Sequence, residues 1–263
     1  MQPIPRLAGR VGRYREQAPL PALRPHFRCV WTNAIPATYA GPVAVVPDGC
    51  VDLVWRDGRL VVAGPDVTAA RPAVRPGTSI LGVRFRAGAA ASWLRLPMSE
   101  IVGCQIDLAE LWGRPADDFC QMLGEIGSIG AQSAVLQRAL VGVLPSVAPP
   151  LPDAAAIFGL MQAGSGPAGG KILALRDRLD ISERTLRRRS HDYFGYGLKT
   201  LDRILRFQCF LALARGQNEV GLAGLAIDAG YADQAHLSRE IQALCGMTAR
   251  DLVRQIAPPR DGP

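Results

Sequence analysis

The sequence is poor in histidine, the residue on which many metal and acid–base sites depend. Among 263 residues there are three, His26, His191 and His236, and only His26 lies in the first 152 positions. No carboxylate stands near them at metal-ligand spacing, whereas a zinc or non-haem iron site needs several donors that converge on one point. We therefore expect no metal, no other cofactor and no catalytic residue, and we expect His26 to be structural.

Long apolar runs and paired cysteines are also lacking. Arg, Asp or Gly interrupts each apolar stretch well before the ~18 residues that a membrane span needs. Residues 1–11 hold arginines and prolines but no apolar run of the secretory kind, and the six cysteines include no C-x-x-C pair. We expect a cytoplasmic protein that is not attached to a membrane and whose cysteines stay reduced.

The chain is basic but contains almost no lysine. Thirty lysines and arginines oppose 23 acidic residues, for a formal net charge of +7, and Lys171 and Lys199 are the only lysines. Arginine is suited to forked contacts with phosphates and guanine edges. The composition therefore permits a polyanionic partner, although GC-rich coding would produce the same bias toward arginine.

Apolar residues make up 48% of the chain, which is enough to form the core of one large or two modest domains. The first half contains short β-type runs bounded by Pro and Gly, and Asp57-Gly58 between two of them is a strong hairpin signal. From residue 89 to residue 144 the apolar spacing becomes helical. Residues 1–144 are therefore predicted to form an antiparallel β barrel or sandwich with packed helices. The runs are Phe27–Thr32, Val43–Val46, Val51–Trp55, Leu60–Ala63 and Thr78–Phe85.

The rest of the chain has a helical pattern that occurs twice. Residues 145–152 are dense in proline and predict an extended linker, and residues 153–263 form the second domain. Ser182 and Asp233 are good N-caps for helices over Glu183–Phe194 and Gln234–Cys245, each preceded by a short helix and a turn. A long helix over Lys199–Arg215 joins the two units. The expected fold class is α+β, with an all-α double helix-turn-helix domain after the β-rich one.

The second unit resembles the second helix-turn-helix of AraC/XylS-type transcription regulators. The resemblance rests on residues 225–239, where Ala226 is the small residue at the helix crossing, Gly230 supplies the turn, Asp233 caps and Leu237 points to the core. It implies that the chain is a transcription regulator that binds double-stranded DNA.

The first unit resembles its family counterpart more loosely. Matching residues are Ser182, Leu186, Arg188 and Gly195. Arg176 stands where a small residue is usual, Asp180 replaces a small turn residue, Ser190 an aromatic core residue and Leu198 a proline. After the second unit, Gly246 and Thr248 match the family pattern, but Ala249 replaces its proline.

The first half resembles a sensor domain found on some AraC-type regulators. The segments that carry this resemblance are Val30-Trp31, residues 47–53, Gly64-Pro65, residues 81–88 and residues 107–112. Together the two resemblances imply transcription control in response to a small-molecule effector.

Both second helices of the units carry candidate DNA contacts. The resemblance assigns Gln234, His236, Ser238 and Arg239 to the exposed face of one helix, where Gln suits adenine and Arg suits guanine. On the other helix Arg184, Arg187 and Arg188 share one face, with Arg189 in the same cluster. For this cluster, base reading, a non-specific grip on phosphate and an ordinary solvated face all stay open.

Candidate effector contacts lie in the first half. Because a strand alternates faces, Cys50 and Asp52 point to the side opposite Val51 and Leu53. Together with Arg84 and Trp31 they form the tentative effector site. The alternative is that the segment from Asp48 is only a turn followed by the start of a strand.

The sequence lacks the residues that two other classes of protein need. A cupin-like enzyme would need several histidines and a glutamate at one point, and a DNA-repair fusion would need clustered cysteines, whereas Cys29 and Cys50 are isolated. A constitutive regulator whose first domain only assembles subunits stays open. A homodimer and RNA polymerase are left open as partners. Neither the effector, the operator, the direction of control nor the oligomeric state has a signal in the sequence.

Overall fold

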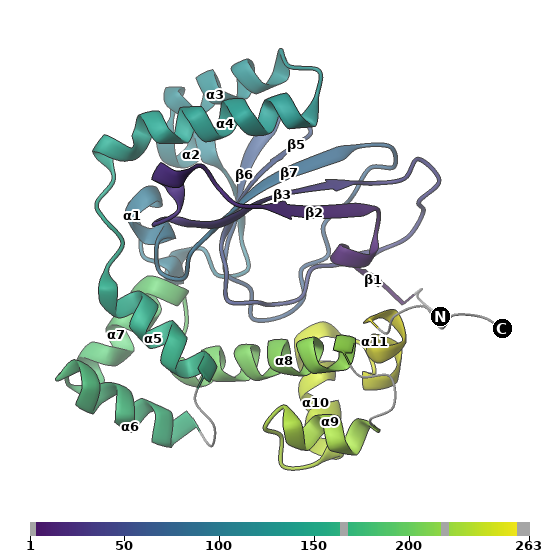
Figure 1. Ribbon diagram of the computed structural model, residues 1–263, viewed down its shortest axis with the longest axis vertical. Coiled ribbons are helices and arrows are strands. Elements are labelled where there is room, and N and C mark those ends of the chain that lie inside the picture. Colours follow the sequence, from purple (N-terminus) through teal and green to yellow (C-terminus); the bar gives the residue numbers. More distant parts are fainter. Residues whose placement is uncertain (1–3, 164–167, 217–220, 257–263) are drawn as a thin grey trace.

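The chain has a β-rich first half and a helical second half, as predicted for the α+β class (Figure 1). The structure is a computed structural model that describes residues 4–163, 168–216 and 221–256. Residues 1–3 and 257–263 of the two predicted domains lie outside these ranges.

Six strands form one antiparallel sheet, and a two-stranded parallel pair lies apart from it. The order in the sheet is β2-β3-β7-β5-β6-β8, so β2 and β8 are its edges. Asp57 and Gly58, with φ of 51° and 77°, make the tight turn between β5 and β6 that the sequence predicted. The strands of the sheet are β2 (Arg13–Gln17), β3 (Phe27–Ala34), β5 (Asp52–Arg56), β6 (Arg59–Ala63), β7 (Ser79–Phe85) and β8 (Gln105–Asp107); the pair is β1 (Arg6–Leu7) and β4 (Val43–Ala44).

One face of the sheet is apolar and covered by helices. Leu53, Leu81 and Val83 are among its fully buried side chains, and four helices pack on them. Figure 1 shows α3 and α4 on this side, away from the helical half of the chain. Because side chains alternate along a strand, the polar residues between these positions point to the opposite face. The helices are α1 (Ala90–Leu94), α2 (Leu108–Trp112), α3 (Arg114–Gly124) and α4 (Ile129–Val143), with 3-10 turns η1 (Ala8–Arg10), η2 (Pro21–Leu23), η3 (Met98–Glu100) and η4 (Leu144–Ser146).

The second half consists of seven helices over its described residues. Helices α7 and α10 have the predicted bounds, and α5 begins at Pro152 because proline is favoured in the first helical turn. Between η4 and α5 the residues Val147 to Leu151 have neither helix nor strand. The helices are α5 (Pro152–Ala163), α6 (Ala168–Leu179), α7 (Glu183–Phe194), α8 (Leu198–Gly216), α9 (Leu222–Asp228), α10 (Gln234–Cys245) and α11 (Ala249–Ile256). Over the described ranges, none of the helices is both long and apolar enough to span a bilayer.

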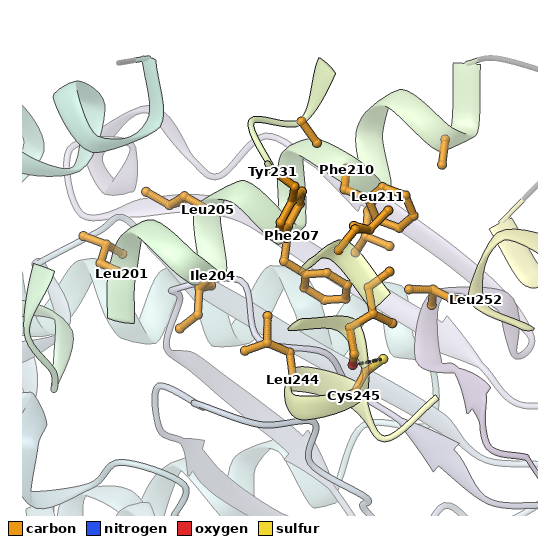
Figure 2. Close-up of a cluster of buried hydrophobic side chains, with 14 of the residues drawn as sticks. Leu201, Ile204, Leu205, Phe207, Phe210, Leu211, Tyr231, Leu244, Cys245 and Leu252 are labelled. Atoms are coloured by element: carbon orange, nitrogen blue, oxygen red, sulfur yellow. Dashed lines mark hydrogen bonds between the residues drawn. The ribbon is translucent and has the colours of Figure 1, made fainter. Parts of the chain in front are cut away.

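Helix α8 is the centre of the helical half. Its apolar side chains are buried against residues of the surrounding helices, and each such burial contributes about 1.5–3 kcal/mol. Figure 2 shows this core, in which the Cys245 thiol donates a hydrogen bond to the Ile241 carbonyl at 3.0 Å. The buried residues labelled there are Leu201, Ile204, Leu205, Phe207, Phe210, Leu211, Tyr231, Leu244, Cys245 and Leu252.

The two halves are in direct contact. Leu7 and Ala44 of the first half belong to the same buried apolar cluster as α8. The Ala69 amide donates to the Leu244 carbonyl at 2.7 Å, and the Gln255 side-chain amide accepts from the Leu7 backbone N–H at 2.9 Å. The Arg10 guanidinium donates to the carbonyl at the end of α11. The proline-rich connection therefore joins two units that also pack on each other.

Candidate nucleic-acid interface and the polar cluster of the sheet

The first helix-turn-helix unit consists of α6, a tight turn and α7. Asp180 has a φ of 48°, a left-handed conformation that aspartate tolerates better than most residues. The Ser182 hydroxyl accepts a hydrogen bond from the Thr185 amide at 3.2 Å and so caps α7, as the sequence predicted.

The departures of this unit from the family pattern are accommodated locally. Ser190 is fully buried and its hydroxyl donates to the Tyr196 carbonyl at 2.7 Å, which closes the turn between α7 and α8. Leu198 is buried at the start of α8. Arg176 reaches Glu183 at 3.8 Å, but its Nε is buried without a hydrogen-bond partner among the described residues. The unit is therefore built with one unfavourable feature, the Arg176 nitrogen.

The second unit, from α9 to α10, has the predicted turn and cap. Gly230 has a φ of 81°, which only glycine adopts without strain, and the Tyr231 amide then donates to the Ala226 carbonyl at 2.8 Å. The Asp233 carboxylate accepts from the His236 amide at 2.6 Å. Helix α10 is consequently fixed at its N-terminus, the end that a recognition helix presents to DNA bases.

The four predicted contacts on α10 have different surroundings. Gln234 and Arg239 are exposed. Ser238 is half-buried and its hydroxyl donates to the Gln234 carbonyl at 2.8 Å. The ring of His236 stands edge-on to Tyr231 at 5.3 Å, and its Nδ1 accepts from the Ala232 amide at 3.4 Å. His236 thus helps to hold the turn, which the sequence did not indicate.

The arginines of α7 divide into two groups. Arg184, Arg187 and Arg188 are exposed and share one face of the helix. Arg189 differs from the sequence prediction, because its Nη1 pairs with the Asp153 carboxylate of α5 at 2.7 Å. The Tyr193 hydroxyl donates to the same carboxylate at 3.2 Å. Arg189 therefore holds α7 against α5 and does not belong to the exposed cluster.

Helix α8 sets the distance between the two units. It has 19 residues, or about 28 Å at the usual rise per residue. Helices α6 and α7 lie near its start, and α9 to α11 gather at its end (Figure 1). This length is close to one turn of B-form DNA, roughly 34 Å.

A buried ionic chain runs along α8, and no motif in the sequence pointed to it. The Asp202 carboxylate, only 1% exposed, accepts from the Lys171 ammonium of α6 at 2.8 Å and also pairs with Arg206. The Arg206 guanidinium lies 5.5 Å from the centre of the Tyr231 ring, in the turn of the second unit. These contacts connect the first helix of one unit with the turn of the other.

The polar face of the sheet carries the residues that the sequence grouped as an effector site. Arg84 of β7 forms a fork with Asp52 of β5, at 3.0 and 2.9 Å, and its third nitrogen lies 3.2 Å from Asp48. Cys50 lies beside them, with its amide donating to Asp48 at 3.0 Å. Val51 and Leu53 point into the apolar core on the other face, as strand alternation predicted.

Burial changes the ionisation of this group. It raises the pKa of the Asp48 carboxyl, with Asp52 adding to the effect and Arg84 opposing it. It also raises the pKa of Asp66 to about 6, with a further contribution from Asp48. Burial raises the pKa of the Cys50 thiol well above its usual value, so the thiol stays protonated at neutral pH and is a poor nucleophile.

Trp31 lies on the same face, because Gly82 leaves room for it. Trp31 and Gly82 are paired across β3 and β7, and a side chain at Gly82 would collide with the indole ring. The indole is therefore laid across β7, two positions from Arg84. Its Nε1 is buried without a hydrogen-bond partner in the described chain.

Tyr196 reaches this group from the helical half, and the sequence analysis missed it. It lies in the turn between α7 and α8, is 5% exposed, and its hydroxyl has no partner among the described residues. Burial raises its pKa, and the nearby Asp48, Cys50 and Asp66 raise it further. Nothing in its sequence context marks it, because its neighbours in this group come from the other half.

Other residues considered in the sequence have structural surroundings. His26 is buried and its Nδ1 accepts from the Trp93 indole at 3.0 Å, in accord with the structural role expected of it. In the part of the chain that the structure describes, no three His, Cys, Asp or Glu side chains are grouped to hold a metal ion.

Two family descriptions match separate parts of the chain. Residues 15–107 match a family described as "Domain of unknown function (DUF6597)", and residues 175–255 match one described as "Helix-turn-helix domain". The first match extends from β2 to β8, and the second from within α6 to within α11. None of the curated proteins matches the sequence.

Several solved structures of ToxT from Vibrio cholerae are distantly similar to the chain. One, from strain O395, is 10% identical with a TM-score of 0.45 and covers 81% of this chain and 93% of that one. A P21 form is 10% identical with a TM-score of 0.44, covering 93% and 97%. ToxT bound to (E)-4-(8-methylnaphthalen-1-yl)but-3-enoic acid is 13% identical with a TM-score of 0.41, covering 80% and 88%.

Proposed function

We propose that the protein is a sequence-specific transcription regulator of the AraC type that binds double-stranded DNA through residues 175–255, the part that matches the helix-turn-helix family. The observation that carries the proposal is the pair of capped helices, α7 and α10, which lie near opposite ends of the long helix α8. Each has exposed polar side chains on its free face. Such a pair suits two successive major grooves on one side of a duplex.

The two helices have different roles in this proposal. Gln234 and Arg239 of α10 read base edges, because their helix is fixed by an intact turn and cap. His236 and Ser238 contribute to the same surface. His236 also holds the turn between α9 and α10, and Ser238 also bonds to the backbone in the first turn of α10. Arg184, Arg187 and Arg188 of α7 chiefly grip phosphate, which adds affinity without sequence preference.

The β-rich half is proposed to control this activity by binding a small molecule. The support is the polar face of the sheet, where Trp31, Cys50, Asp52 and Arg84 lie together beside the helical half. The alternative is a constitutive regulator whose first half only assembles subunits. A regulator of this kind acts in the cytoplasm and needs no catalytic group.

Footprinting of the full chain on its operator tests the DNA-binding proposal. We expect two protected patches on one face of the duplex, with centres roughly 34 Å or 10.5 bp apart, because α8 fixes the distance between the units. The Arg239→Ala variant should lose the patch of the second unit first. A single patch, or two patches on opposite faces, would remove the two-unit proposal.

A further inference from the structure

The polar cluster of the sheet has more carboxylates than cations. We define it as Asp48, Cys50, Asp52, Asp66 and Arg84. All three nitrogens of Arg84 are engaged by Asp48 and Asp52, at 2.9 to 3.2 Å. Asp66 lies close enough to Asp48 to have its pKa raised by it, and no ion pair reaches Asp66 from the described residues. The cluster therefore has three carboxyl groups for one guanidinium.

A second, independent feature points at the same place. The Tyr196 hydroxyl is buried and has no hydrogen-bond partner in the described ranges, although a buried hydroxyl without a partner is costly. Its oxygen lies 3.8 Å from where a Cβ on Gly49 would stand, and Gly49 joins Asp48 to Cys50. The hydroxyl thus lies beside the segment that joins Asp48 to Cys50, although Tyr196 belongs to the other half of the molecule.

Aromatic surface completes the arrangement. Trp31 lies across Gly82 on the polar face, and the Tyr14 ring of β2 lies 5.9 Å from it. Carboxylates beside aromatic faces are the chemistry that recognises organic cations. These side chains are not arranged as a group that could hold a metal ion, and the rest of the described chain has no such group either. An anion fits less well, since the guanidinium of Arg84 is already neutralised.

We propose that the polar cluster binds a small organic cation, an amine or guanidine, as the effector. Asp48 and Asp66 supply the counter-charge, the Tyr196 hydroxyl accepts a hydrogen bond from the cation, and the Trp31 ring covers it. This assignment rests on the proposed ligand control of the protein and names the chemical class of the ligand.

The position of the cluster explains how binding of such a ligand affects the DNA-binding half. The Gln208 side chain of α8 donates to the Pro47 carbonyl at 2.6 Å, next to Asp48. A Cβ on Gly49 would stand 3.3 Å from Phe158 of α5 and 3.5 Å from Leu201 of α8. A cation that pairs with Asp48 therefore acts directly on residues 47–49, the segment that packs against α5 and α8.

Calorimetric titration of the full chain tests the ligand class without DNA. The probes are 1,4-diaminobutane and agmatine, with hexanoate as the matched anion. We expect a cation to bind and hexanoate not to bind. The Asp48→Asn and Asp66→Asn variants should each lower the affinity for the cation by about tenfold, which is the effect of losing one close charge pair. Asp117→Asn, on the exposed surface of α3, is the matched control and should bind like the parent.

Three results would overturn the assignment: neither cation binds, hexanoate binds as tightly as the cations, or both Asn variants retain the affinity of the parent. Should Asp48→Asn fail to fold, Tyr196→Phe decides by the same criterion, because it removes one oxygen and leaves every described ion pair in place. Titration of the same preparation with operator DNA, without probes, shows separately whether the DNA-binding proposal fails.

Discussion

Neighbouring residues of the same type have different roles on α7. The guanidinium of Arg189 is committed to Asp153, whereas Arg184, Arg187 and Arg188 are exposed. The helical period predicts which of them share a face, but it cannot predict a partner that lies 36 positions earlier in the chain. The number of arginines in a sequence cluster is therefore only an upper limit to the number that can contact DNA.

Arg187→Ala and Arg239→Ala should weaken DNA binding in different ways. Arg187 is proposed to contact phosphate. Its loss should therefore weaken binding to cognate and to non-cognate DNA almost alike, and should reduce the slope of log affinity against log salt concentration by about 1. Arg239 is proposed to read a base from a firmly capped helix, so its loss should cost about 1–3 kcal/mol on the preferred base only. Binding titrations at several salt concentrations separate the two effects.

Arg189→Ala is the matched control for this pair of variants. Since Arg189 pairs with Asp153, its loss should lower stability by about 1 kcal/mol while the salt slope of the folded protein stays that of the parent. If Arg187→Ala abolished discrimination between sequences while Arg239→Ala left it intact, the proposed roles of the two helices would be reversed.

At the scale of elements, α8 orients both units through charge as well as through apolar packing. Asp202 is 1% exposed and accepts from both Lys171 and Arg206. A buried ion pair contributes little net stability compared with apolar residues, but removing one partner leaves a buried charge uncompensated. The Lys171 ammonium also donates to the Met161 carbonyl at 3.1 Å, so it cannot turn to solvent without losing a second contact.

Asp202→Asn should therefore destabilise the protein by about 3–5 kcal/mol, because Lys171 and Arg206 keep their charges and lose their shared carboxylate. Chemical denaturation of the full chain measures this. Asp177→Asn makes the same chemical change on the exposed surface of α6 and should change stability by less than about 0.5 kcal/mol. Equal small effects of the two variants would show that the ionic chain does not hold the units.

The elements that the sequence predicted are those with local signals. The caps at Ser182 and Asp233 and the hairpin at Asp57-Gly58 depend on a few neighbouring residues, and the structure confirms them. The strand Arg13–Gln17 was not predicted because it is an edge strand with four polar residues out of five. The pairing of Gln208 with Pro47 spans 161 positions, and no local pattern encodes such a contact.

The whole molecule depends on how closely its two halves approach each other. Gly88, in the turn between β7 and α1, faces Ala154 of α5 so closely that a side chain there would collide with it. Ala154 is 2% exposed and cannot move without shifting α5. The linker from Val147 to Leu151 precedes α5 directly, so a displacement of this helix changes the linker first.

Gly88→Ala should loosen the contact between the halves, and Gly58→Ala is its matched control. Both glycines have a positive φ, 79° and 77°, so an added Cβ strains each backbone by a similar amount, about 1–2 kcal/mol. A Cβ at Gly58 meets nothing within 4 Å, whereas the one at Gly88 must also push α5 away, which should cost about 1–3 kcal/mol more. We expect a lower Tm for Gly88→Ala than for Gly58→Ala, and faster proteolysis within residues 147–151 in Gly88→Ala alone. Equal Tm values and equal proteolysis in the two variants would show that the halves are not held together at this contact.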